Sequence, residues 1–112
     1  MSRNIGMNGE KKALDYLSQF NFRLIQQNFL TPFGEIDLIG QIDKCLIFVE
    51  VKMRASSRYG LAAEMVSYHK QQKIRKAAMA FLQKNKAYQS LDCRFDVIAI
   101  TEGQLEWIKA AF

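Results

Sequence analysis

The chain has 112 residues, and 49% of them are hydrophobic, which is enough for one domain with its own core. Sixteen Lys and Arg against eleven Asp and Glu give a net charge of +5, which suits a polyanionic partner such as nucleic acid or an anionic membrane surface. No apolar run is long enough for a signal peptide or a membrane span, so we expect a soluble, cytoplasmic protein with a single domain over residues 1–112. Cys45 and Cys93 lack the spacing of a zinc site, and we expect both to be buried.

The hydrophobic pattern predicts an α/β domain in which helices pack on one mixed β-sheet. Helical spacing of apolar residues marks two amphipathic helices, and Ser67 is a suitable N-cap for the second. The strand over residues 45–53 is apolar on both faces between Cys45 and Val49, which favours a central place in the sheet. The predicted elements are a helix over 5–20, strands over 22–29, 35–40 and 45–53, a helix over 67–84, and strands over 94–100 and 105–108.

Three charged residues lie within the two best strand candidates. Side chains alternate along a strand, so Glu50 and Lys52 point to the same face. A two-residue turn at 42–43 would place Asp37 opposite Phe48 and diagonal to Glu50, whereas a four-residue loop would place Asp37 directly opposite Glu50. Either register puts all three on one face. Two carboxylates so close together repel each other, and a divalent cation between them allows both to stay ionised.

The first helix adds a third carboxylate. Glu10 shares the apolar stripe of Ala13, Leu14 and Leu17, so we expect it to face the sheet. Oxygen ligands with no Cys or His nearby favour Mg²⁺ or Mn²⁺ over zinc, and such an ion suits hydrolysis of a phosphodiester. In the alternative interpretation these residues form a structural ion-pair cluster. The presence of all four in a basic protein favours a catalytic site made of Glu10, Asp37, Glu50 and Lys52.

Four short motifs together resemble a known family. They are Gly9-Glu10, GEIDLI at 34–39, VEVK at 49–52 followed by Arg54, and RFDV at 94–97. They are similar to the YraN family of uncharacterised bacterial proteins, which belongs with the Holliday junction resolvases and other restriction-endonuclease-like nucleases of the PD-(D/E)XK type. The resemblance covers residues 6–112. One departure is that Ile36, not Pro, precedes Asp37.

The resemblance implies roles for particular residues. Asp37 stands for the Asp of the motif, and the stretch from Glu50 to Lys52 stands for its (D/E)XK. Glu10 stands for the Glu that resolvase-like members carry on a helix. The metal would be held by Asp37, Glu50, Glu10 and the backbone carbonyl of Val51. The family also implies an αβββαβ core and a tendency to dimerise.

Basic residues around the second helix are candidates for contact with DNA phosphates. They are Arg54, Arg58, Lys70 and Lys73, and Gln71 joins them as a polar residue near the catalytic lysine, as in some related nucleases. For other basic residues of that helix, Arg75, Lys76 and Lys84, the alternative is a solvated helix face.

The sequence therefore predicts a Mg²⁺- or Mn²⁺-dependent endonuclease that cleaves DNA, with branched or otherwise structured DNA as the expected substrate. A first alternative is a nucleic-acid-binding module that keeps the nuclease fold and acts through a partner without turnover of its own. A second is a scaffold protein that pairs through the apolar C-terminal segment at residues 105–112.

Overall fold

The computed structural model describes residues 2–54 and 66–112, with side chains from Gly9 onward except that of Arg54. Every predicted element is present, and its ends lie within three residues of the predicted ones. The elements are α1 (Ser2–Ser18), β1 (Arg23–Thr31), β2 (Gly34–Ile42), β3 (Cys45–Arg54), α2 (Tyr68–Lys84), a 3₁₀ turn (Lys86–Tyr88), β4 (Asp92–Thr101) and β5 (Gln104–Ile108).

The five strands form one mixed sheet in the order β1-β2-β3-β4-β5, so β3 occupies the predicted central place. Neighbouring strands are antiparallel except β3 and β4, which run parallel. A parallel pair needs a crossover connection, and α2 lies in the chain between β3 and β4. The protein is thus an α/β protein whose architecture is consistent with the restriction-endonuclease-like fold predicted from the sequence.

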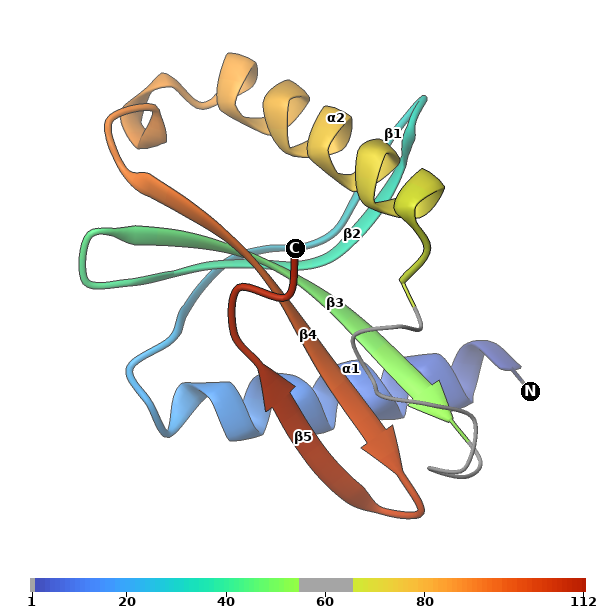
Figure 1. Cartoon of the computed structure of the whole chain (residues 1–112). Helices are drawn as coiled ribbons and strands as arrows, with labels where there is room; N and C mark the ends of the chain where they lie inside the picture. The colour runs from blue at the N-terminus through green and yellow to red at the C-terminus, as the bar shows by residue number, and fades with distance from the viewer. Residues whose placement is uncertain (1, 55–65) are drawn as a thin grey trace.

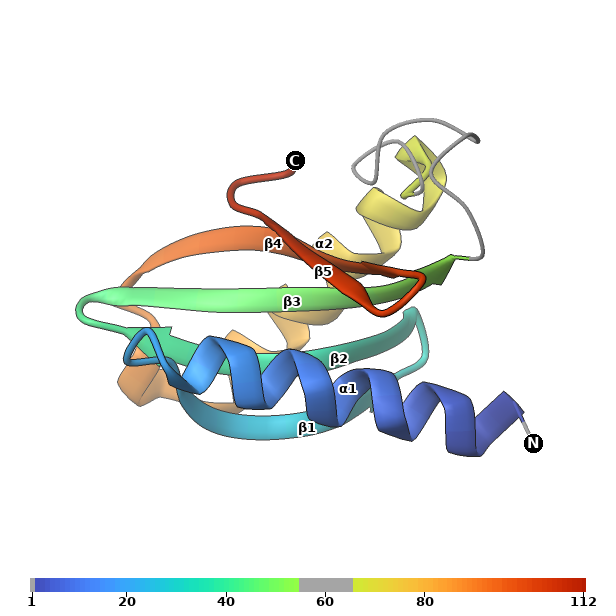
Figure 2. The same ribbon diagram turned by 90° about the horizontal axis from the view of Figure 1, so that it is seen from below.

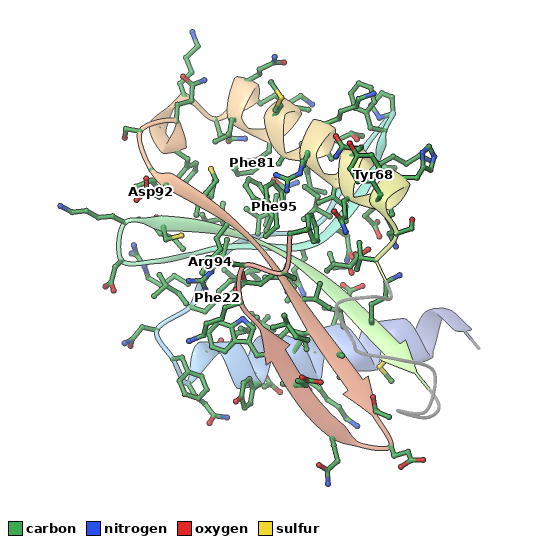
Figure 3. The ribbon with its side chains drawn as sticks, viewed as in Figure 1. Phe22, Tyr68, Phe81, Asp92, Arg94 and Phe95 are labelled. Carbon is green, nitrogen blue, oxygen red and sulfur yellow. The ribbon has the colours of Figure 1, made fainter. Side chains whose placement is uncertain are left out.

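The two helices cover opposite faces of the sheet (Figures 1 and 2). On the α1 face, Ala13 and Leu17 pack against buried residues of three strands, Leu38, Ile47, Val49, Ile98 and Ile100. On the α2 face, Ile74 and Phe81 pack with Phe29, Ile39, Phe48 and Val97. Figure 3 shows Phe81 and Phe95 between α2 and the sheet, and Phe22 on the side of α1. Each face of the sheet therefore has its own core.

The start of α2 is fixed by the predicted cap. The hydroxyl of Ser67 accepts a hydrogen bond from the backbone N–H of Lys70 at 3.2 Å. The side-chain amide of Gln71 donates to the carbonyl of Val66 at 3.0 Å. These two bonds hold the first turn of the helix, which carries Lys70.

Two further expectations concern the burial of the cysteines and the absence of a membrane-spanning helix. Cys93 is exposed and Cys45 is only partly buried, so the prediction that both cysteines are buried is wrong. The reason is that they lie in the first two residues of β4 and β3, where the strands leave the core. None of the helices within the described part of the chain has the length and hydrophobicity needed to cross a membrane.

A close contact between Phe22 and Gly40 closes the α1 face of the sheet. A Cβ atom added to Gly40 would lie 2.1 Å from the ring of Phe22, whose side chain is buried. Glycine inside a strand normally costs about 0.5–1 kcal/mol relative to alanine, so a Gly→Ala change would ordinarily stabilise the strand. Here the overlap with a packed ring outweighs that gain.

We therefore expect Gly40→Ala to lower the free energy of unfolding by about 1–3 kcal/mol, the usual cost of overpacking a core. Urea denaturation followed by circular dichroism measures it. Adding Phe22→Leu to Gly40→Ala should recover part of the loss, because the smaller side chain leaves room for the methyl group. An unchanged midpoint in the single variant would contradict the proposed contact.

Candidate active site

The site begins where β2 and β3 separate. Leu38 pairs with Val49, and the pairing between the two strands stops there, although β2 begins at Gly34 and β3 runs on to Arg54. Beyond this pair the strands diverge, as Figure 1 shows. The backbone N–H of Val51 donates instead to Oδ2 of Asp37, at 2.8 Å. A carboxylate thus takes the place of the backbone acceptor that a continuing ladder would supply.

The register brings Asp37 and Glu50 together. The turn consists of Asp43 and Lys44, because Ile42 pairs with Cys45. It is a two-residue turn, but it lies one residue later than the turn considered in the sequence analysis. Asp37 and Glu50 therefore follow the Leu38–Val49 pair directly, which is the arrangement expected for the four-residue loop.

The closeness of these two acids changes their chemistry. Burial, then the hydrogen bond and the charge interaction with Glu50, raise the pKa of Asp37 to about 8. The N–H of Val51 acts in the opposite direction, because it stabilises the carboxylate. Two carboxyl groups that can share a proton are also a pair that a divalent cation can bridge.

Glu10 reaches the same region from α1. The side-chain amide of Asn28, oriented with its nitrogen toward the carboxylate, donates to Glu10 at 2.8 Å. Burial and the charges of Glu35 and Glu50 raise the pKa of Glu10, and the hydrogen bond from Asn28 opposes them. The charge of Glu10 also contributes to the raised pKa of Asp37. Glu10 therefore lies within electrostatic reach of both strand carboxylates.

A glycine allows α1 to come this close. A Cβ atom on Gly9, the residue before Glu10, would lie 2.7 Å from Sδ of Met53 near the end of β3. Any other residue would force Met53 to move.

Two lysines surround the carboxylate of Glu50. Nζ of Lys70, from α2, lies 2.6 Å from Oε2 of Glu50, and Nζ of Lys52 lies 4.0 Å from the same oxygen. Burial and the neighbouring Lys70 lower the pKa of Lys52. Burial acts to lower the pKa of Lys70 as well, but its contacts with Glu50 and Lys52 outweigh this and raise it. The site thus combines two close acids with one strongly paired and one weakly paired ammonium.

The two buried acids of the described chain differ sharply in their partners. Asp96, fully buried, accepts four hydrogen bonds, two from Arg94, one from the indole of Trp107 and one from the N–H of Ala110. Glu50 is 5% exposed, and its Oε2 accepts no hydrogen bond from any described residue, because the Lys70 contact is an ion pair without hydrogen-bond geometry. Asp96, from the RFDV motif, therefore has a structural role, whereas in the described chain Oε2 of Glu50 is held only by its ion pairs with Lys70 and Lys52.

These residues fit a hard divalent ion, with one qualification. Within residues 9–53 and 66–112, no group of three or more Asp, Glu, His or Cys side chains is placed to hold a metal by itself. Asp37 and Glu50 supply two carboxylates, and hard ions accept backbone carbonyls and water as their other ligands. The observation that favours such an ion is that the buried Oε2 of Glu50 lies beside a second carboxylate and has no hydrogen bond from the described residues, only ion pairs with lysines. The roles of Glu10 and of the Val51 carbonyl as ligands stay predictions.

The predicted DNA-contacting residues fall into three groups. Lys70 and Lys73 line a small cleft of about 50 Å³ with Phe33, Glu35 and other residues. Gln71 has a local partner, the Val66 carbonyl at the start of α2. Arg58 and the side chain of Arg54 lie outside the described residues.

Sequence reasoning missed three contributors to the site. Asn28 and Glu35 were not singled out, and Lys70 was predicted to contact DNA phosphates, without its contact with Glu50. The only sequence signal for Asn28 is its residue type, since Asn tolerates the positive φ of 52° that it adopts within β1. For Lys70 the signal was its helical position beside Ile74, which contributes to the core.

Comparison with known proteins gives one consistent result. The sequence profile described as "Uncharacterised protein family UPF0102" matches residues 9–100. A UPF0102 protein of Francisella tularensis subsp. novicida is 42% identical, with 96% of this chain and 93% of the relative covered. The UPF0102 protein VP0448 of Vibrio parahaemolyticus is 44% identical, covering 97% and 92%, and a UPF0102 protein of Saccharophagus degradans is 46% identical, covering 96% and 91%.

The structural role of Asp96 predicts a large stability effect. Asp96→Asn places an amide nitrogen where two donors now converge, so we expect it to lower the free energy of unfolding by about 3–5 kcal/mol, as breaking a buried ion pair usually does. Asp92→Asn, on the same strand and exposed, should change it by no more than about 0.5 kcal/mol. Urea denaturation of the two variants measures both; equal, small effects would show that the four hydrogen bonds contribute little.

The raised pKa of Asp37 predicts a pH dependence of stability without added metal. Between its ordinary pKa of 3.8 and about 8, the folded protein holds a proton that the unfolded chain releases. The free energy of unfolding should therefore fall as the pH rises through this window. The fall should be about 1–3 kcal/mol larger than in Asp37→Asn, because that variant keeps an acceptor for the N–H of Val51 but has no proton to lose. Urea denaturation from pH 5 to pH 8.5 in EDTA tests this, and parallel profiles for the two proteins would refute it.

Proposed function

The chain belongs to the UPF0102 family, the YraN family indicated by its motifs, and we propose that it is a Mg²⁺- or Mn²⁺-dependent endonuclease acting on DNA. The observation that carries the proposal is the meeting of Asp37, Glu50 and Lys52 at the separation of β2 and β3. The structural acid Asp96 is saturated by four hydrogen bonds, whereas among the described residues Oε2 of Glu50 is held only by two ammonium groups, at 2.6 and 4.0 Å, beside a second carboxylate.

Asp37 and Glu50 would hold the ion, with the Val51 carbonyl, Glu10 or water completing its shell. When bound, the ion supplies a water of lowered pKa and positive charge beside the phosphate. Asp37 is already held in place by the N–H of Val51, so one ligand is oriented before any ion arrives. Glu10, held by Asn28, would orient water on the side of α1.

Lys52 would act on the reacting groups. Its ammonium is 4.0 Å from Glu50 and 23% of its side chain is exposed, so it is free to hydrogen-bond to the attacking water or to a phosphate oxygen. Burial and Lys70 lower the pKa of Lys52, which makes it easier for Nζ to give up a proton. A compact ammonium on a rigid central strand can also stabilise the charge that builds up on the phosphate.

DNA would approach from the side of α2 and the β1–β2 turn. Lys70 and Lys73 lie there at the cleft with Phe33 and Glu35, and the net charge of +5 favours a polyanion. Contacts of this kind bind phosphates with little base preference. The proposals that the DNA is branched and that the protein acts as a dimer rest on the resemblance to Holliday junction resolvases.

Cleavage assays test the proposed function. We expect cutting of four-way junction, flap or single-stranded DNA in Mg²⁺ or Mn²⁺, and none in EDTA. Asp37→Asn and Lys52→Ala should each reduce the rate by about a hundredfold or more, because each removes a group that acts on the reacting centre.

Matched controls lie at the other end of the same hairpin. Asp43→Asn and Lys44→Ala make the same chemical changes at exposed turn residues and should cut at the wild-type rate. Absence of cleavage on every substrate, or equal rates in all variants, would reject the enzyme. If the protein then still binds DNA, it is the binding module that acts through a partner.

A further inference from the structure

Lys70 stands apart from the other lysines of α2. Its ammonium lies 2.6 Å from Oε2 of Glu50, a carboxylate that is 5% exposed, while 42% of the lysine side chain is exposed. Lys73, one turn later, is exposed and forms no ion pair with a side chain that the structure describes. The ammonium of Lys70 therefore lies inside the site, although a large part of its side chain is exposed to solvent.

The place occupied by Nζ is the place that a divalent ion needs. Ions such as Mg²⁺ bind carboxylate oxygens at about 2.0–2.1 Å. An ammonium at 2.6 Å from the same oxygen would be only a few ångströms from that ion, and two positive charges at such a distance repel strongly in a half-buried site. Lys70 and a metal ion would therefore compete for Oε2 of Glu50.

The structure also provides a place for the displaced ammonium. The backbone of Lys70 is fixed by the Ser67 cap and the first turn of α2, whereas its side chain has four rotatable bonds. That side chain lines the cleft formed with Phe33, Gly34, Glu35, Lys73 and Ile74. Rotation into this cleft would bring two ammonium groups, those of Lys70 and Lys73, together beside the acids.

We propose that Lys70 competes with the divalent ion for Glu50, and that binding of the ion releases the Lys70 ammonium to hold a phosphate of the DNA substrate. This rests on the proposed function, because it assigns a further role to a residue at the same site. Lys70 is then a counter-ion when metal is absent and a substrate-binding residue when metal is present. Metal and DNA then bind with positive coupling. The metal frees Lys70 to hold a phosphate, and the phosphate, by holding Lys70, frees Glu50 for the metal.

Calorimetric titration with Mn²⁺ in the absence of DNA tests the competition. Lys70→Met should bind Mn²⁺ about tenfold more tightly than the wild type, because the ion no longer displaces an ammonium. Lys73→Met removes the same charge one turn away without touching Glu50, and should change the affinity less than about twofold. Lys70→Arg keeps the charge and should stay near the wild-type affinity.

A second measurement is independent of metal uptake. In EDTA, Lys70→Met should melt at a lower temperature than Lys73→Met, because only the former leaves Glu50 without its closest counter-ion. Equal melting temperatures would show that the ion pair does not stabilise the site and would overturn the role of Lys70 as counter-ion.

The outcomes separate this inference from the function on which it rests. If the wild type binds Mn²⁺ and Lys70→Met binds it equally or more weakly, Lys70 is no competitor, and the nuclease proposal is untouched. If Lys70→Arg binds as tightly as Lys70→Met, the charge of Lys70 is not the cause, and the inference again fails. If neither the wild type nor any variant takes up Mn²⁺, the metal site itself is wrong and both proposals fall.

Discussion

The whole site depends on the hydrogen bond between the backbone N–H of Val51 and the carboxylate of Asp37. An N–H in the middle of a sheet needs an acceptor, and here β2 offers a side chain in place of a carbonyl because the two strands have begun to diverge. The same bond therefore does two things. It ends the pairing of β2 with β3 without leaving the Val51 N–H unsatisfied, and it fixes a half-buried carboxylate beside the buried Glu50.

The divergence also explains how elements on opposite faces can share one site. α1 and α2 are separated by the sheet along most of its length (Figure 2). Where the sheet opens, Glu10 from α1 and Lys70 from α2 both come within range of Glu50. In this cluster the charge of Glu50 helps to raise the pKa of Asp37 and of Glu10, and the ammonium groups of Lys70 and Lys52 both lie near one oxygen of Glu50. Such a cluster contributes little to stability compared with the saturated Asp96, which is why it is better explained as a working site.

Much of this arrangement was predictable, and the remainder has a physical reason for being hidden. Alternation along a strand puts Glu50 and Lys52 on one face, and helical spacing puts Glu10 on the inner side of α1. The position of the turn at Asp43 and Lys44 was not predictable. Because β3 is apolar on both faces, moving the turn by one residue still places apolar side chains on each face of the sheet. The contact of Lys70 with Glu50 depends on where the crossover delivers the start of α2, and no local pattern encodes that. Likewise, no sequence pattern around Asp96 reveals that the indole of Trp107 and the N–H of Ala110 donate hydrogen bonds to it.

The packing of one helix on each face has a consequence for how the protein is made. The two cores lie on opposite faces of the sheet, and the acids and amines meet only where both helices pack on the same opened sheet. A partly folded chain, with one helix detached, lacks either Glu10 or Lys70 at the cluster. In the proposed nuclease, a newly synthesised or damaged molecule would therefore lack the complete site until both helices have docked.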